Sequence, residues 1–262
     1  MSPGTQISPT AALSQRGTAV VTGAAVRIGR AVAMDLARQG FRTVVHFRDS
    51  ASEAEATVAD IAAAGGQAMA VAADLQQPEE AVQRIWEQAT GRFGPVTLLV
   101  NNAAIFEGGG LGETDSLTWE RLFAVNLRAP YVLCEHFATE LGDDETGQII
   151  NLVDWRGLQP DPERLAYSLT KHGLVALTKT LAESLAPRIR VNAVAPGPVL
   201  PAPGADPNEL AHAASVSPLG RTGGPEDVVS AVRYLVDAPL VTGEVMAVAG
   251  GSQLPPARMS LG

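Results

Sequence analysis

Near its N-terminus the chain reads TAVVTGAAVRIG over residues 18–29, an apolar β-branched run that passes into a glycine-bearing turn. The run predicts a buried strand, and the residues after the turn have the apolar spacing of a helix. Small residues in such a turn let the backbone approach a pyrophosphate, and a helix N-terminus adds unpaired N–H groups with a partial positive charge. We therefore expect the first strand-to-helix junction of a dinucleotide-binding domain.

The alternation of strand and helix continues along the whole chain. Apolar runs predict strands over residues 18–22, 42–47, 67–72, 96–100, 148–153, 189–195 and 244–248. Helical spacing predicts helices over residues 28–39, 51–64, 78–91, 116–141, 163–186 and 225–236. Runs without polar alternation are typical of parallel strands covered on both faces. The sequence thus predicts an α/β fold, a single doubly wound, Rossmann-type domain with a central, mostly parallel seven-stranded sheet.

Two segments depart from this alternation. Residues 1–16 are rich in Ser, Thr, Pro and Ala and lack the pattern of a secretory signal, so we expect a flexible N-terminal tail before a single catalytic domain over residues 17–262. Residues 196–220 carry repeated prolines and predict a long excursion, of the kind that often serves as a lid or binding loop.

Composition excludes several classes of function. The net charge of −9 disfavours a nucleic-acid partner, and no apolar run is long enough to span a bilayer. The single cysteine, Cys134, lies in an apolar stretch, which predicts a core position and suits a reducing, cytoplasmic location. The four histidines lack the spacing of metal ligands, so no metal is predicted.

The turn after the first strand supplies the first candidate cofactor contacts, Gly23, Arg27, Ile28 and Gly29. Arg27 stands where dinucleotide folds of this kind usually have glycine, so it adds a cation to the phosphate-binding turn. Simple surface exposure is the alternative role for Arg27.

The end of the second strand reads His46-Phe47-Arg48-Asp49-Ser50. NAD-preferring enzymes place an acid here to bind the ribose 2′-hydroxyl, but this chain has Phe47 at about that position. Arg48 and Ser50 offer a guanidinium and a hydroxyl to a 2′-phosphate. The segment, His46 included, therefore predicts cofactor contacts and a preference for NADPH over NADH.

The next two strand ends add further candidates. Asp74, with Leu75 beside it, could bind the adenine amino group or simply cap the following turn, and the sequence leaves both open. Asn102, Ala103 and Ala104 follow the fourth strand, where small residues and an amide can pack against a cofactor ribose. These positions belong to the carboxyl edge of the sheet, where such folds bind ligands.

Tyr167 and Lys171 are the candidate catalytic pair. They lie four residues apart in a predicted helix, so both side chains project from one face. A nearby ammonium favours the phenolate and lowers the pKa of a tyrosine toward a useful acid or base. Taken alone, a Tyr and a Lys at this spacing are more often an ordinary exposed helix pair, because the combination is frequent by chance.

An ordered set of motifs from Thr18 to Gly251 resembles the short-chain dehydrogenases/reductases; it consists of Thr22-Gly23…Gly29, Asn101-Asn102-Ala103, Asn126, Tyr167…Lys171 and Pro196-Gly197. The resemblance implies hydride transfer from a nicotinamide to an unsaturated carbon, with Tyr167 delivering the proton and Lys171 holding the nicotinamide ribose. It further implies that Asn126 organises a proton-relay water, that Pro196 and Gly197 contact the cofactor, and that the protein is a homotetramer.

One position departs from the family pattern. The family usually has a serine thirteen residues before the tyrosine, which donates a hydrogen bond to a substrate carbonyl, and this chain has Asp154. An ionised carboxylate cannot donate, and it repels the charge that develops on a ketone oxygen. It suits a substrate with an imine nitrogen or N–H donors.

The substitution at Asp154 is similar to the pteridine reductases within this family, as are Arg27 and the segment 46–50. Phe106 is a further similarity, because pteridine reductases stack an aromatic ring at this point on the pterin, although plain core packing remains an alternative. The resemblance implies that Arg27, Phe106, Asp154 and Tyr167 contact the substrate.

The leading hypothesis is an NADPH-dependent reductase that converts a pterin or folate ring from the dihydro to the tetrahydro level. One alternative is a carbonyl reductase in which a protonated Asp154 donates like the serine. The other is a non-catalytic NADPH-binding sensor, against which the joint presence of Asn126, Tyr167 and Lys171 argues.

Overall fold

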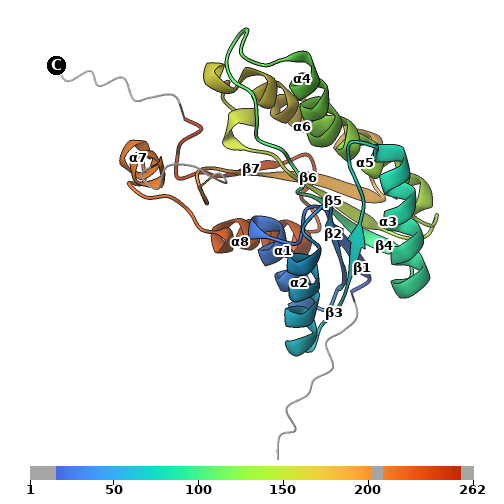
Figure 1. The fold of residues 1–262 in the computed structure, drawn as a ribbon. Coiled ribbons are helices and arrows are strands. Elements are labelled where there is room, and N and C mark those ends of the chain that lie inside the picture. The colour runs from blue at the N-terminus through green and yellow to red at the C-terminus, as the bar shows by residue number, and fades with distance from the viewer. Residues whose placement is uncertain (1–15, 202–208, 255–262) are drawn as a thin grey trace, which may run out of the picture.

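Seven parallel strands form one sheet in the computed structural model, which describes residues 16–201 and 209–254 (Figure 1). The strands lie in the order β3-β2-β1-β4-β5-β6-β7, and every neighbouring pair is parallel. Their bounds are β1 (Thr18–Val21), β2 (Arg42–Phe47), β3 (Gln67–Ala72), β4 (Val96–Asn101), β5 (Gly147–Leu152), β6 (Ile189–Pro196) and β7 (Val245–Val248). The doubly wound α/β fold expected from the sequence is confirmed.

The helices also match the sequence pattern, with two differences. They are α1 (Arg27–Arg38), α2 (Ala51–Ala63), α3 (Pro78–Phe93), α4 (Ser116–Phe123), α5 (Ala129–Glu140), α6 (Leu165–Ser184), α7 (Glu209–Val216) and α8 (Pro225–Asp237). The helix predicted over residues 116–141 is interrupted by a π-helical segment, η1 (Ala124–Arg128). Helix α7 was not predicted, because it lies in the proline-rich excursion, of which residues 202–208 fall outside the described part.

The helices cover both faces of the sheet, because successive strand residues point to opposite sides. Helices α1, α2 and α8 pack on one face, where Val21, Val45 and Val100 belong to the same buried cluster as Leu36 and Leu235. Helices α3, α5 and α6 cover the other face, against a cluster that contains Val20, Val44, Leu99, Ile85 and Phe137. Both faces of each central strand are therefore dry, as their uninterrupted apolar sequences predict.

The remaining sequence expectations concern the N-terminal tail, Cys134 and membrane-spanning helices. Of the predicted tail, residues 1–15 lie outside the described residues, and Arg16 forms a 2.6 Å ion pair with Asp237. Cys134 is fully buried, as predicted. Of the helices that the structure describes, none combines the length and apolar character needed to cross a bilayer.

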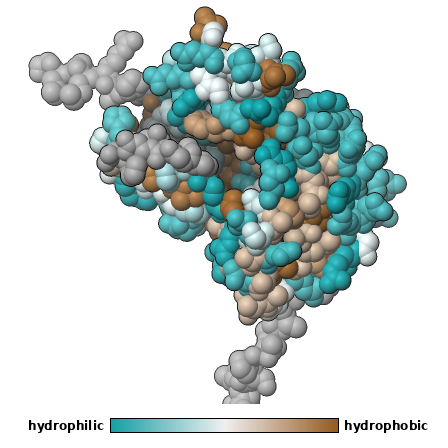
Figure 2. Space-filling view, viewed as in Figure 1, coloured by the Kyte–Doolittle hydropathy of each residue, from teal (hydrophilic) through white to brown (hydrophobic). Residues whose placement is uncertain are grey.

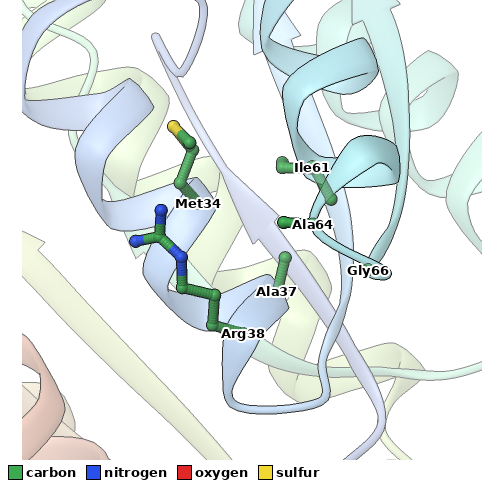
Figure 3. Close-up of a pocket in the computed structure, with 6 residues that line it drawn as sticks. All are labelled: Met34, Ala37, Arg38, Ile61, Ala64 and Gly66. Carbon is green, nitrogen blue, oxygen red and sulfur yellow. The ribbon is translucent and has the colours of Figure 1, made fainter.

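A small cavity between α1 and α2 lies away from the carboxyl edge of the sheet (Figure 3). Its volume is about 10 Å³, which is close to the space of a single water. It is lined by Met34, Ala37, Arg38, Ile61, Ala64 and Gly66. This cavity is a packing gap and cannot hold a substrate.

Candidate active site

The site lies where the strand order reverses. Strand β1 has β2 on one side and β4 on the other, so the connections after β1 and β4 leave the sheet in opposite directions. Ligands of doubly wound sheets bind in the crevice outside the carboxyl ends at such a point. Figure 2 shows this end of the molecule hollowed between the part that carries α4 and α6 and the part that carries α1 and α8.

The glycine turn after β1 is packed tightly against the end of β4. Gly23 has a φ of +61°, and a Cβ on Gly29 would lie 2.2 Å from the carbonyl oxygen of Gly23. The amide of Asn102 donates to the carbonyl oxygens of Thr22, at 2.8 Å, and Gly23, at 3.0 Å. The side-chain nitrogen of Asn102, the predicted ribose contact, is thus used in hydrogen bonds that hold the turn.

Arg27 begins α1 in an unusual backbone conformation. Its φ is +57°, the left-handed region that favours glycine, and it is the one non-glycine residue with positive φ in the described residues. Its guanidinium lies 3.4 Å from the carbonyl oxygen of Leu200, in the loop after β6. The N-cap, Val26, supplies no side-chain cap, so the first N–H groups of α1 stay available to an anion.

His46 has a structural role that the sequence did not reveal. The ring is buried; Nδ1 accepts from the Gly23 amide at 3.1 Å, and Nε2 donates to the Ala73 carbonyl at 3.1 Å. Burial lowers the pKa of His46 to about 4, so the ring is neutral. Both ring nitrogens are bonded within the protein, so the His46 side chain positions the turn, and the contact of this residue with the cofactor stays a prediction.

The residues after His46 place a guanidinium and a hydroxyl at the end of β2. Phe47 is partly buried against the α1 face of the core, while Arg48 is exposed, with its Nε 2.5 Å from Asp49. Ser50 is the N-cap residue of α2, yet its hydroxyl makes no capping bond. Arg48 and Ser50 therefore both present polar groups at the end of β2.

Asp74 and Leu75 follow β3. Oδ1 of Asp74 accepts from the Gln76 amide at 3.0 Å, which favours the turn-capping role, and the Leu75 side chain is buried in the core. An open groove of about 680 Å³ begins here. It is lined by Arg48, Asp49, Ala72, Ala73, Asp74, Gln76, Arg84, Glu107 and Arg121.

The catalytic candidates meet at the ends of β5 and α6. The Tyr167 hydroxyl donates to Oδ2 of Asp154 at 3.2 Å, and the Lys171 ammonium donates to the Leu152 carbonyl at 3.1 Å. Tyr167 and Lys171 are 5% and 2% exposed. The structure thus brings together three predicted residues, with the Lys171 ammonium 5.7 Å from the centroid of the Tyr167 ring.

Burial governs the protonation of these three groups. It raises the pKa of Asp154, and burial and then the Asp154 charge raise the pKa of Tyr167 well above its ordinary value. Burial lowers the pKa of Lys171 to about 8, against the attraction of Asp154. The predicted lowering of the tyrosine pKa by Lys171 is wrong for this geometry, since burial has the largest effect on the Tyr167 pKa and the charge and hydrogen bond of Asp154 add to it. Tyr167 is a protonated acid.

Asp154 is fixed by the turn that follows it. Its Oδ1 accepts from the Arg156 amide at 2.8 Å and caps a short 3₁₀ turn, η2 (Trp155–Gly157). The Arg156 guanidinium lies 3.7 Å from the same oxygen. One carboxylate oxygen is therefore held by backbone and cation, which leaves Oδ2 for Tyr167.

Asn126 lies in the π-helical segment η1 and is buried. Its side-chain amide accepts from the Ile105 N–H and donates to the Ile105 carbonyl, both at 2.9 Å. π-Helical segments recur at functional sites because they shift the backbone bonding pattern locally. The Asn126 side chain thus holds the segment that carries Phe106, and a role in a water relay stays a prediction.

Phe106 lies beside Tyr167. Its ring meets the Tyr167 ring edge-on, with centroids 4.8 Å apart, and the residue is 39% exposed. Plain core packing is thereby excluded, and part of the Phe106 side chain is accessible to a ligand. Gly197, after β6, lies so close to the β7 end that a Cβ would come within 2.6 Å of Ala249. Among the small residues after β4, Ala103 is partly buried and Ala104 is exposed.

Two arginines at this site were missed by the sequence analysis. Arg156 and Arg164 place their guanidinium carbons 5.4 Å and 5.0 Å from the centroid of the Phe106 ring. Their spacing from the catalytic residues was a usable signal, because Arg156 is two residues after Asp154 and Arg164 one helical turn before Tyr167. Among the described residues, no group of three or more His, Cys, Asp or Glu side chains forms a metal site.

Comparison with known proteins identifies this arrangement. A family model described as short chain dehydrogenase matches residues 17–209. The chain belongs to this family. A 3-oxoacyl-[acyl-carrier-protein] reductase from Synechocystis is 35% identical over 240 residues, which cover 89% of this chain and 95% of that protein. An uncharacterised oxidoreductase from Methylorubrum extorquens is 39% identical over 248 residues, with 89% and 96% covered.

Solved structures extend the comparison of this short-chain dehydrogenase. The crystal structure of FolM alternative dihydrofolate reductase 1 from Brucella canis complexed with NADP has a TM-score of 0.89 and 38% identity. The match covers 95% of this chain and 99% of the Brucella chain. The corresponding protein from Brucella suis, also in complex with NADP, is 39% identical, with a TM-score of 0.87 over 92% of this chain and 96% of that one.

Proposed function

We propose that this short-chain dehydrogenase catalyses the NADPH-dependent reduction of a pterin or folate ring from the dihydro to the tetrahydro level. The observation that carries the proposal is the acceptor Asp154, which receives the Tyr167 hydroxyl bond at 3.2 Å. An acceptor beside the proton donor suits a substrate that brings N–H groups of its own. The likeness to the FolM proteins, which are named as alternative dihydrofolate reductases, supports the same substrate class.

The glycine turn and the end of β2 fit NADPH. The backbone of Gly23 and Gly29 leaves no room for a Cβ, and the uncapped start of α1 faces the same crevice, as a pyrophosphate requires. Arg48 and Ser50 suit a 2′-phosphate, and the two Brucella structures are complexes with NADP. The residues that would hold the cofactor are Gly23, Arg27, Ile28, Gly29, Phe47, Arg48, Ser50, Asp74, Leu75, Asn102, Ala103, Ala104, Tyr167, Lys171, Pro196 and Gly197.

Each residue at the reacting end has a separate task. NADPH, when bound, supplies a hydride to the carbon of a ring C=N bond. Tyr167 gives its proton to the adjacent nitrogen, and Asp154 accepts N–H groups of the heterocycle and orients it. Lys171 contributes a positive charge beside the phenol, and the exposed face of Phe106 stacks on the ring. Arg27, at the start of α1, would contact the heterocycle or the cofactor phosphates.

The proposal is tested by following NADPH oxidation with dihydrobiopterin, dihydromonapterin and dihydrofolate. We expect turnover with at least one of them, and a higher melting temperature of the protein in the presence of NADPH. Inactivity on all three, together with good turnover of ordinary ketones, would overturn the substrate class while leaving the cofactor assignment intact.

A second candidate function is reduction of a carbonyl. Burial raises the pKa of Asp154, and a protonated carboxyl can donate to a ketone as a serine does. The Synechocystis relative is named as a 3-oxoacyl reductase, which fits this reading. The pH profile separates the two functions, because ketone reduction should disappear as a single acid ionises.

A non-catalytic NADPH sensor is the third reading, and Tyr167→Phe separates it from an enzyme. A sensor keeps its NADPH-dependent rise in melting temperature, and there is no turnover to lose. An enzyme keeps the rise in melting temperature but loses turnover about 10²- to 10⁴-fold, the usual contribution of a positioned general acid.

A homotetramer is part of the same proposal. Exposed Leu117 on α4 and Leu169 on α6 are apolar side chains that an interface between subunits could cover. Sedimentation velocity measures the mass directly, and a monomer at micromolar concentration would contradict the assembly. A cytoplasmic location stays a prediction, which rests on the single buried cysteine.

A further inference from the structure

The ring of Phe106 carries two guanidinium groups at the mouth of the site. Arg156 and Arg164 both lie within 5.4 Å of its centroid, while the Tyr167 ring packs against it in a T-shaped arrangement. Any ring stacked on Phe106 would therefore extend its substituents past these cations. The two arginines are not equivalent, because the protein neutralises them to different extents.

Arg156 is neutralised by neighbouring carboxylates. Its Nε donates to Asp161 at 2.6 Å, and its guanidinium lies 3.7 Å from Asp154. Arg156 also stacks over the Trp155 ring at 4.7 Å. This side chain is 24% exposed and its charge is already paired, so it serves to hold Asp154 and the η2 turn.

Arg164 carries the charge that remains uncompensated. Its guanidinium donates to a neutral group, the carbonyl oxygen of Gly108, at 2.6 Å. Within residues 16–201 and 209–254 it forms no ion pair, and Glu107, beside that carbonyl, is paired with Arg121 instead. A partly buried guanidinium held over an aromatic ring, without a carboxylate, is positioned to receive an anion.

We infer that Arg164 is a specificity-determining residue that selects substrates whose ring bears an anionic carboxylate tail, so folates are preferred over pterins with neutral side chains. The inference rests on the proposed function and names the substrate class within it. The stacked ring sits on Phe106 beside Tyr167, and the tail leaves the pocket past Arg164. Charge attraction lowers the KM for the anionic substrate without changing the chemical step.

The test compares dihydrofolate, which has a carboxylate tail, with dihydrobiopterin, whose side chain is neutral. For Arg164→Gln we expect the KM for dihydrofolate to rise about five- to tenfold with kcat little changed, whereas both constants for dihydrobiopterin stay within about twofold. In the native protein, the KM for dihydrofolate should also rise with ionic strength, since salt screens the attraction.

Two variants separate charge recognition from a structural role of Arg164. Arg164→Lys keeps the positive charge but not the fork geometry of its bond to Gly108, so charge recognition predicts substantial recovery of the dihydrofolate KM. Arg128→Gln, which removes an exposed arginine paired with Glu79, is the matched control and should leave both substrates unaffected.

The possible failures are distinguishable. Equal losses for both substrates in Arg164→Gln, without recovery in Arg164→Lys, would show that Arg164 only anchors the loop, and would overturn this inference alone. Turnover of dihydrobiopterin with no use of dihydrofolate would also overturn it. Absence of NADPH oxidation with both pterin and folate would instead reject the proposed function.

Discussion

The Tyr167 hydroxyl donates a hydrogen bond of 3.2 Å to Oδ2 of Asp154, while Oδ1 of Asp154 accepts a hydrogen bond of 2.8 Å from the Arg156 amide. The carboxylate is therefore anchored by one oxygen and faces the phenol with the other. A serine at this position would instead present a group that can donate to a substrate carbonyl. We therefore expect the pair Asp154 and Tyr167 to select substrates by the functional group that they place beside the phenol.

Replacing Asp154 by serine should change substrate choice more than cofactor binding. We expect kcat/KM for a dihydropterin to fall about 10²-fold or more, since the acceptor for the ring N–H groups is lost. The Kd for NADPH should stay within about threefold, and ketone reduction should increase. Fluorescence titration and steady-state kinetics measure the two effects, and Asp154→Asn is the control of similar shape. An equal loss of pterin turnover and NADPH affinity would contradict the assigned role.

Activity should fall as the pH rises through about 8. Burial lowers the pKa of Lys171 to about 8, and the site uses the ammonium form. Above this pH the lysine loses its proton and with it the charge beside Tyr167, so kcat/KM decreases on the alkaline side. Lys171→Arg keeps its charge at all accessible pH values, so any remaining activity of this variant should lack this alkaline limb. An alkaline limb near the ordinary lysine pKa in the native protein would contradict the prediction.

His46 should make the protein sensitive to acid. Its folded pKa is about 4, against 6.5 in the unfolded chain, so the unfolded state binds more protons between these values. The contribution is complete above pH 6.5 and is lost as the pH falls to 4, with a maximum of about 3 kcal/mol.

The substitution His46→Asn tests this linkage by denaturant unfolding across the same pH range. The Asn carbonyl oxygen can still accept from the Gly23 amide, but this side chain does not titrate. The free energy of unfolding of His46→Asn should therefore change less between pH 6.5 and 4 than that of the native protein. His46→Leu removes the acceptor as well and should weaken NADPH binding. Identical pH dependence in the native protein and His46→Asn would exclude His46 as the sensitive group.

Arg27→Gly should separate folding stability from binding. A left-handed φ destabilises a non-glycine residue by about 1 kcal/mol or more, and Arg27→Gly removes this strain. Glycine also loses more conformational entropy on folding, which offsets part of the stabilisation. The free energy of unfolding should therefore stay constant or rise by up to about 1 kcal/mol. The Kd for NADPH should increase about fivefold, because a cation is lost from the phosphate-binding turn. Arg27→Lys, which keeps charge and conformation, is the control, and an unchanged Kd in Arg27→Gly would show that Arg27 makes no cofactor contact.

The sheet was predictable because its signals are local. Each strand is a short apolar run, and each intervening helix has its own periodic apolar face, so the element order and the parallel arrangement follow from the sequence alone. The break at η1 was not predictable, since Ala124–Arg128 has ordinary helical composition and its π-helical bonding depends on the packing of Asn126 against Ile105. Helix α7 was hidden by the prolines around it.

The grouping of Tyr167, Lys171 and Asp154 was predictable, because their residue types and spacing in the sequence indicate a common site. The role of His46 was not, because a histidine at a strand end gives no indication that both ring nitrogens will be bonded inside the protein. Arg164 was missed for a similar reason. The proposed role of Arg164 depends on its lacking an ion pair in the described residues, and ion pairing is a property of the folded structure.

The two bonds of His46 join the glycine turn after β1 to the end of β3, so these two parts of the predicted cofactor site are tied to one rigid ring. Because the glycine turn and the end of β3 are already held together, little conformational entropy is lost at either of them when a ligand binds. We therefore expect only small backbone adjustments when the cofactor binds, as in a preorganised site. Selectivity between substrates then depends on the separate loops around Phe106.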